Sequence, residues 1–212
     1  MKKALLIDLG NVLVRFDHEL TVRRVADAAK LSDVGELRSA LFGPLEREFD
    51  LGRLEAKDFF RAVERSVGLP RLADDVWIPA WRDIFDPIPE ALALLGQVVP
   101  GTRIVLVSNT NSLHWEGVLA VAPIDRLVEA TALSFELGAV KPDPRIFRHA
   151  LGLAGVTPAD AAFADDRPSL DAAALELGID AFEAGSVAGL TAGLTRHGLL
   201  PERPSPGKLS PS

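Results

Sequence analysis

Three short apolar runs in this sequence each stop abruptly at polar residues. Residues 4–7 precede Asp8, residues 104–107 precede Ser108, and residues 161–164 precede Asp165. Near-continuous apolar runs are typical of parallel strands that are covered on both faces. Ligands of such sheets bind beyond the carboxyl ends of the strands. The pattern therefore predicts one site, formed by polar residues at a single edge of a sheet.

The spacing of apolar residues changes along the chain. Between residues 16 and 86 they recur at helical spacing, and after Pro87 helical and strand patterns alternate. Together with the first run, we expect strands near residues 103–107, 128–133, 161–164 and 180–183. This alternation predicts an α/β fold with a doubly wound, mostly parallel, Rossmann-like sheet and an inserted all-α subdomain.

These patterns divide the chain into three parts. We expect residues 1–15 and 87–200 to form the α/β core domain and residues 16–86 a helical cap subdomain. Residues 201–212 are rich in Pro and Ser without apolar periodicity, which predicts a mobile tail.

Charge and composition limit the partners. The net charge of −7, from 23 basic and 30 acidic residues, comes without a basic cluster, so we expect no nucleic-acid or membrane partner. The absence of cysteine excludes thiolate metal sites and a cysteine nucleophile. No apolar stretch is long enough to span a membrane and no signal peptide precedes residue 4, which favours a cytoplasmic protein. The sequence leaves a homodimer open.

Asp8 is the first candidate for chemistry. A carboxylate at a strand end, beside the flexible turn at Gly10, is placed to attack an electrophilic phosphorus and form an aspartyl phosphate. Gly10 also lets its backbone carbonyl approach a cation. Taken alone, an aspartate after a strand is more often a turn or helix cap.

Anion binding is indicated by two further segments. Ser108 and Asn109 leave a strand and enter a helix, where hydroxyl and amide groups face an anion, although the same residues also suit an ordinary N-cap. Lys141 precedes Pro142, which favours an extended backbone that would aim the ammonium at a phosphate. A solvated surface lysine is the alternative.

Asp165 and Asp166 directly follow an apolar strand. Two adjacent carboxylates repel unless a cation compensates them, and oxygen ligands suit Mg²⁺. The alternative is an acidic pair that the dipole of the next helix stabilises.

Four segments together resemble the signatures of the haloacid dehalogenase-like hydrolase superfamily. They are residues 7–13, 107–111, 137–142 and 163–167. The resemblance spans residues 4 to about 185 and is strongest to a sugar-phosphatase branch whose first motif reads Asp-Leu-Gly-Asn, with a helical cap after that motif. It implies a magnesium-dependent phosphatase that acts on a small phosphorylated metabolite.

The resemblance also implies roles for single residues. Asp8 would be the nucleophile and a magnesium ligand. The Gly10 carbonyl and Asp166 would complete the protein ligands, and Asp165 would act directly or through water. The transferring phosphoryl group would be bound by Ser108, Asn109 and Lys141.

Two positions depart from the family pattern. Most phosphatases of the superfamily carry a second aspartate, the general acid and base, where this chain has Gly10. General acid catalysis is worth about 10²–10⁴-fold, so its loss favours better leaving groups such as anomeric sugar phosphates, unless a cap residue or a metal-linked water substitutes. Leu170 stands where Asn is common, and its helical stripe predicts a core position.

Other residues carry weaker signals. His114 is close in sequence to Ser108, but we interpret it as a packing or surface residue. The charged cluster of Glu46, Arg47 and Asp50 would meet a sugar, although such a run is usually a solvated face. Trp77 and Trp81 have helical spacing, which favours the cap core over a sugar platform.

Three alternative functions remain. A haloacid-type dehalogenase shares the nucleophile but has no need of the paired acids at 165 and 166. A phosphomutase requires the acid-base group that Gly10 lacks. A non-catalytic phosphate- or protein-binding module with the same fold is the alternative from a different class.

Overall fold

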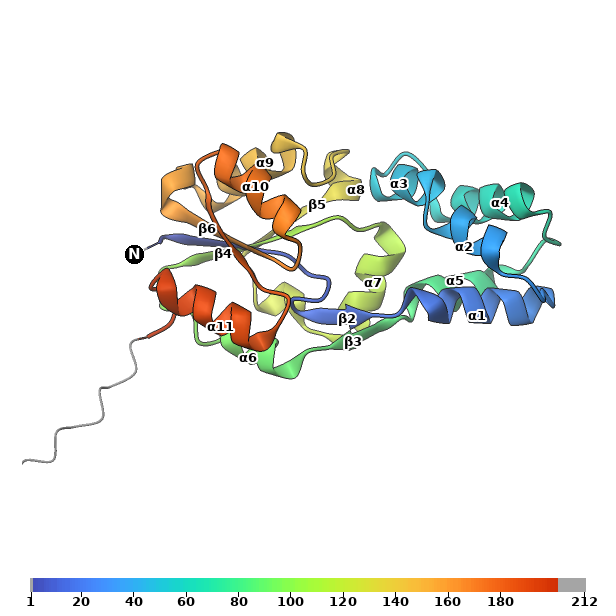
Figure 1. Cartoon of the computed structure of the whole chain (residues 1–212), viewed down its shortest axis with the longest axis horizontal. Coiled ribbons are helices and arrows are strands. Elements are labelled where there is room, and N and C mark those ends of the chain that lie inside the picture. Colours follow the sequence, from blue (N-terminus) through green and yellow to red (C-terminus); the bar gives the residue numbers. More distant parts are fainter. Residues whose placement is uncertain (1, 202–212) are drawn as a thin grey trace, which may run out of the picture.

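A five-stranded parallel sheet forms the centre of the larger part of the molecule (Figure 1). In spatial order its strands are β5 (Ala130–Leu133), β4 (Arg103–Ser108), β1 (Ala4–Ile7), β6 (Ala161–Asp165) and β7 (Asp180–Glu183). Each neighbouring pair is parallel. The predicted α/β fold with a mostly parallel, doubly wound sheet is confirmed. Strand β5 begins at Ala130, slightly later than expected.

Helices cover both faces of the sheet (Figure 1). One face packs against α6 (Pro89–Leu95), α7 (Ser112–Val121) and α11 (Val187–Arg196), and the other against α9 (Pro144–Ala154) and α10 (Pro168–Glu176). Leu5 and Ile7 point to the first face, whereas Ala4 and Leu6 point to the second, as the two-residue period of a strand requires. The run is apolar throughout because neither face of β1 meets water.

Short turns complete this part of the chain. They are the helix α8 (Ser134–Leu137) and the 3₁₀ turns η1 (Ile124–Arg126) and η2 (Pro158–Asp160).

Five helices form a second unit beside the sheet (Figure 1). They are α1 (His18–Ala29), α2 (Gly35–Leu41), α3 (Pro44–Asp50), α4 (Ala56–Val67) and α5 (Asp74–Arg82). Their apolar faces enclose a separate core that includes the fully buried Trp77 and Trp81. Leu113 of α7 joins this core, so the two units share a packed contact.

The two chain crossings between the units form a ribbon that the sequence analysis missed. Strand β2 (Val14–Phe16) pairs antiparallel with β3 (Phe85–Pro87), and Phe16 lies opposite Phe85. The expected helical segment 16–86 therefore begins and ends in strands. Three residues per strand are too few for the alternation of a strand to stand out in a sequence.

The structure is a computed structural model that describes residues 2–201. Apart from Pro201, the predicted mobile tail lies outside the described residues. Within residues 2–201, no helix combines the length and apolar character that a membrane span needs.

Candidate active site

The three polar strand ends meet at one edge of the sheet. Asp8 follows β1, Ser108 is the last residue of β4, and Asp165 is the last residue of β6. A carboxylate oxygen from each of Asp8, Asp165 and Asp166 lies within 4.8 Å of the other two. Asp8 and Asp165 are buried and Asp166 is partly exposed. The parallel register explains this meeting, because it brings the carboxyl ends of β1, β4 and β6 together.

Lys141 lies among these carboxylates. Its ammonium donates hydrogen bonds to Asp8 Oδ1 and to Asp165 Oδ2, both at 2.6 Å, and its side chain is fully buried. The residue lies in a turn before α9. The Asp143 amide, which donates to the Val140 carbonyl at 2.8 Å, closes that turn. Here Lys141 binds the two carboxylates rather than facing open space.

Asn109 holds the backbone of Lys141 in place. Its side-chain amide donates to the Lys141 carbonyl at 3.1 Å and accepts from the Lys141 amide at 2.6 Å. Ser108 is buried and contributes to the wall of a cavity in front of Asp8. Of the three predicted phosphate-binding residues, Ser108 and Asn109 line that cavity, and Asn109 also positions the third, Lys141.

The charge balance of this cluster suits a divalent cation. Burial raises the pKa of Asp8, and Lys141 lowers it less strongly. The three carboxylates are balanced by two cations, the Lys141 ammonium and the Arg167 guanidinium, which leaves one excess negative charge at a largely buried site. Mg²⁺ binds such oxygen donors and relieves their repulsion. The side chains of Asp8, Asp165 and Asp166 therefore fit the ion, although Asp165 already accepts bonds from Lys141 and from the Arg167 amide.

Gly10 lies at the cavity wall beside the cluster. A Cβ atom at this position would lie 2.9 Å from the ring of Phe16, closer than side chains normally approach. The aromatic ring thus occupies the space into which a residue 10 side chain would extend.

The cavity in front of Asp8 has a volume of about 280 Å³ and lies between the two units. The sheet unit contributes Asp8, Ser108 and Asp166, and the helical unit contributes His18, Glu46 and Asp50. Rings of Phe16 and Phe85, from the ribbon, also line it. Sequence reasoning gave Glu46 and Asp50 little weight because a charged run in a helix usually faces solvent.

Asn111 is the residue whose importance the sequence hides. It is fully buried and is the N-cap of α7, where its Oδ1 accepts from the His114 amide at 3.0 Å. The same oxygen accepts from Trp81 Nε1 at 3.1 Å, and its Nδ2 donates to Asp50 at 2.9 Å. Asn111 therefore joins the sheet unit to helices α5 and α3 of the helical unit. An N-cap preference is the only signal that the sequence offers.

His114 is buried at the same junction. Its ring stacks on Trp81 with centroids 4.6 Å apart, and burial lowers its pKa to about 3. It is therefore a neutral packing residue that also reaches the cavity wall. The core positions predicted for Trp77, Trp81 and Leu170 are confirmed by their burial.

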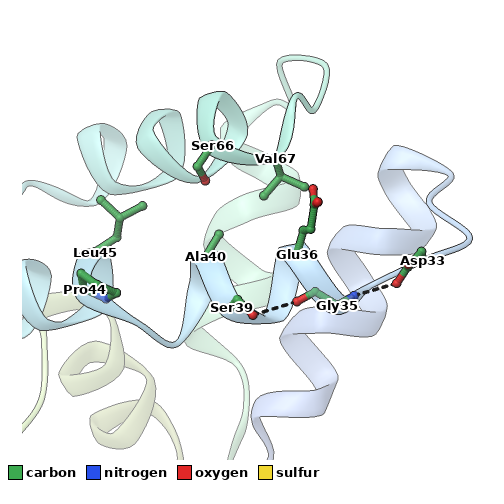
Figure 2. A pocket seen from close by; sticks show the side chains of 9 residues that line it. All are labelled: Asp33, Gly35, Glu36, Ser39, Ala40, Pro44, Leu45, Ser66 and Val67. Carbon is green, nitrogen blue, oxygen red and sulfur yellow. Dashed lines mark hydrogen bonds between the residues drawn. The ribbon is translucent and has the colours of Figure 1, made fainter.

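A larger cavity of about 660 Å³ lies within the helical unit, away from these residues (Figure 2). It is bounded by α2, α3 and the end of α4. Two of its polar groups serve the start of α2: Asp33 accepts from the Gly35 amide and Ser39 donates to the Gly35 carbonyl. None of the candidate catalytic residues lines it.

The sequence matches one protein family over most of its length. The family model for haloacid dehalogenase-like hydrolases matches residues 2–178. The chain belongs to this family. The predicted superfamily is thereby confirmed, and the protein is a hydrolase of the haloacid dehalogenase-like type.

Individual relatives in this family are similar over different lengths. A phosphoserine phosphatase from Thermus thermophilus is 30% identical over 72% of this chain but only 59% of its own length. A D-ribitol-5-phosphate phosphatase from Bacteroides thetaiotaomicron is 26% identical over 86% of this chain and 92% of its own.

A solved structure supports the same grouping. A crystal structure of a family enzyme from Bacteroides thetaiotaomicron, in complex with magnesium and inorganic phosphate, has a TM-score of 0.77 and 28% identity. The match covers 88% of this chain and 96% of that one.

Proposed function

We propose that this hydrolase is a magnesium-dependent phosphatase of small phosphomonoesters, with Asp8 as the nucleophile. The observation that carries the proposal is the cluster of Asp8, Asp165 and Asp166, in which the buried Lys141 ammonium binds the first two. Asp8 and Asp166 line a cavity together with Ser108. The names of the two phosphatase relatives and the magnesium and phosphate complex of the similar structure support it.

In the proposed reaction one residue acts as the nucleophile and the others stabilise charge. Asp8 attacks the phosphorus atom and forms an aspartyl phosphate, which water then hydrolyses. Ser108 and Lys141 supply hydrogen-bond donors for the phosphoryl oxygens. The transition state of phosphoryl transfer spreads negative charge over these oxygens, and the donors stabilise it. Asp8, Asp165, Asp166 and the Gly10 carbonyl would hold Mg²⁺, which supplies positive charge for the same oxygens.

The helical unit is proposed as the cap that selects the leaving group. Its residues His18, Glu46 and Asp50 line the cavity that Asp8 also lines, and would face a substrate's organic part. Polyol and sugar hydroxyls are suited to hydrogen bonds with the Glu46 and Asp50 carboxyl groups and to the faces of Phe16 and Phe85. Because Gly10 offers no proton, sugar 1-phosphates are favoured over 6-phosphates unless another group donates one.

The experiment is phosphate release from a panel of phosphomonoesters, with and without Mg²⁺. We expect release that depends on Mg²⁺ and is lost in Asp8→Asn. The matched control Asp27→Asn changes an exposed aspartate of α1 and should retain full activity. No release from any phosphomonoester by the unaltered protein would favour the non-catalytic module. Release of halide from 2-haloacids without Mg²⁺ would favour the dehalogenase.

A further inference from the structure

The proposed reaction needs a proton that the first motif does not supply. Breaking the P–O bond of an ester leaves an alkoxide, which requires a general acid unless it is already stable. The usual position for that acid is Gly10, and the ring of Phe16 lies 2.9 Å from where its Cβ atom would be. Any substitute must therefore reach the cavity from elsewhere.

Few groups on the cavity wall can fill this role. Asp8 and Asp166 are assigned above to the nucleophile and the cation, and the Arg167 guanidinium does not release protons.

The two histidines on the wall lack a proton to give. Burial lowers the pKa of His18, as it does for His114, so both rings are neutral near pH 7. Burial raises the pKa of Asp50 to about 6, and the hydrogen bond that it accepts from Asn111 limits this rise, so Asp50 is mostly ionised near pH 7. Within the described residues that line this cavity, Glu46 is the remaining acid.

Glu46 has the placement that a proton donor needs. It lies on α3 of the helical unit, on the wall of the cavity shared with Asp8, and its side chain is partly buried. Within residues 2–201 it makes no hydrogen bond or ion pair to another side chain, so its carboxyl group is free to meet a ligand. Glu48 on the same helix differs, because it pairs with Arg53 at 3.0 Å.

We propose that Glu46 is the general acid and base of this enzyme, acting from the cap in place of the acid missing at Gly10. The inference rests on the phosphatase function proposed above. It identifies a catalytic residue on a part of the chain that the four sequence motifs do not include.

The electrostatic surroundings keep a proton on Glu46. Burial, and less strongly the nearby carboxylate of Asp50 one helical turn along α3, raise its pKa to about 8. Across the cavity it faces the neutral rings of His18 and His114, the carboxylates of Asp8 and Asp166, and Arg167. The α2, α4 and α8 helices contribute no charged group to this wall. Glu46 is therefore largely protonated near pH 7.

The reaction has two steps, and the proton that Glu46 gives up in the first is restored in the second. In the first, Asp8 forms a bond to phosphorus, the ester P–O bond breaks, and the Glu46 proton passes to the departing oxygen. In the second, the Glu46 carboxylate takes a proton from water as the oxygen of that water attacks the aspartyl phosphate. This step restores protonated Glu46, frees Asp8 and releases phosphate.

The test compares two aryl phosphates that differ in their need for a proton. p-Nitrophenolate leaves readily unprotonated, whereas phenol has a pKa of about 10, like tyrosine. In single-turnover experiments with Mg²⁺, Glu46→Gln should slow phosphorylation by phenyl phosphate at least about tenfold, toward the 10²–10⁴-fold worth of an acid, and phosphorylation by p-nitrophenyl phosphate by less than about threefold. It should also give a burst of p-nitrophenolate followed by slow turnover, because the second step lacks its base.

Two further variants separate chemistry from folding. Glu48→Gln makes the same change on the same helix, outside the cavity, and should alter neither rate. Glu46→Asp keeps the carboxyl group and should restore part of the phenyl phosphate rate. The rate of the unaltered protein with phenyl phosphate should fall as the pH rises through about 8, and this limb should disappear in Glu46→Gln.

Each outcome decides the inference. Equal slowing of both substrates in Glu46→Gln, or no slowing of either, overturns the acid role while leaving the phosphatase function intact. If the unaltered protein hydrolyses no phosphomonoester, the phosphatase proposal fails, and the acid role fails with it.

Discussion

Replacement of Asn111 by alanine tests whether one buried amide holds the two units together. The change removes the N-cap of α7, which costs about 1 kcal/mol. It also leaves the indole N–H of the fully buried Trp81 without its acceptor, which costs about 1–3 kcal/mol more. Asp50 loses its donor as well, but its partial exposure lets water replace that bond. We therefore expect Asn111→Ala to lower the free energy of unfolding by about 3 kcal/mol.

Urea unfolding at pH 7 measures this loss, and the chain offers a matched control. Ser186 is the N-cap of α11, but its Oγ serves that helix alone, accepting from the Gly189 amide at 3.1 Å. Ser186→Ala should cost about 1 kcal/mol. If both alanine variants lose the same free energy within about 0.5 kcal/mol, the bonds from Asn111 across the two units contribute nothing and the reasoning is wrong.

A double-mutant cycle isolates the Trp81 bond. Trp81→Phe removes the indole donor while keeping an aromatic ring in the cap core. If the bond matters, the loss caused by Asn111→Ala should be at least about 1 kcal/mol smaller in the Trp81→Phe background. Fully additive losses would contradict the assignment.

Two further substitutions test charge inside the helical unit and packing between that unit and α7. Glu64→Gln should destabilise the protein by about 1.5–3 kcal/mol at pH 7. Burial alone would raise the pKa of Glu64, but hydrogen bonds, including the one from Arg61, lower it overall, so the folded protein favours the charged carboxylate. The pKa of Glu64 in the folded protein lies below the ordinary value of 4.5. Urea unfolding should therefore show the full difference in unfolding free energy between the unaltered protein and Glu64→Gln above pH 4.5, and the difference should disappear as the pH falls below that value. Gly117→Ala would put a Cβ atom 2.1 Å from the Arg82 carbonyl and so push α5 away from α7. We expect the free energy of unfolding to fall by about 1–3 kcal/mol and kcat/KM to fall as well. The control Gly152→Ala adds its Cβ atom in open space and should stabilise its helix by about 0.5–1 kcal/mol; destabilisation in both variants would refute the packing argument.

Much of the sheet unit could be predicted because its signals are local. The apolar run before Asp8 is long enough to identify a strand, and Pro144 and Pro168 stand at the first turns of α9 and α10. Parallel pairing then brings the strand ends together without any further information. For this reason the proximity of Asp8 and Asp165 follows from the sequence pattern, whereas their contacts with Lys141 required coordinates.

The residues that the sequence left obscure act between the two units. Glu46 and Asp50 look like a solvated charged run until the helical unit is placed over Asp8. Asn111 resembles any N-cap, because the Trp81 that it binds is 30 residues away and on the other unit. The space beside Gly10 is filled by a ring from the short β2 strand, which local patterns could not identify. Such contacts depend on tertiary packing and leave little trace in local composition.

The pairing of Phe16 with Phe85 brings the two ends of the inserted helical segment together. Paired strands lie about 5 Å apart, so the chain leaves the sheet and returns to it almost at the same place. A different insert with similarly close ends can occupy this position without altering the order or the register of the parallel strands. The parallel sheet with Asp8, Asp165 and Asp166 can therefore be retained while one continuous stretch of sequence, which lines the opposite wall of the cavity, is exchanged.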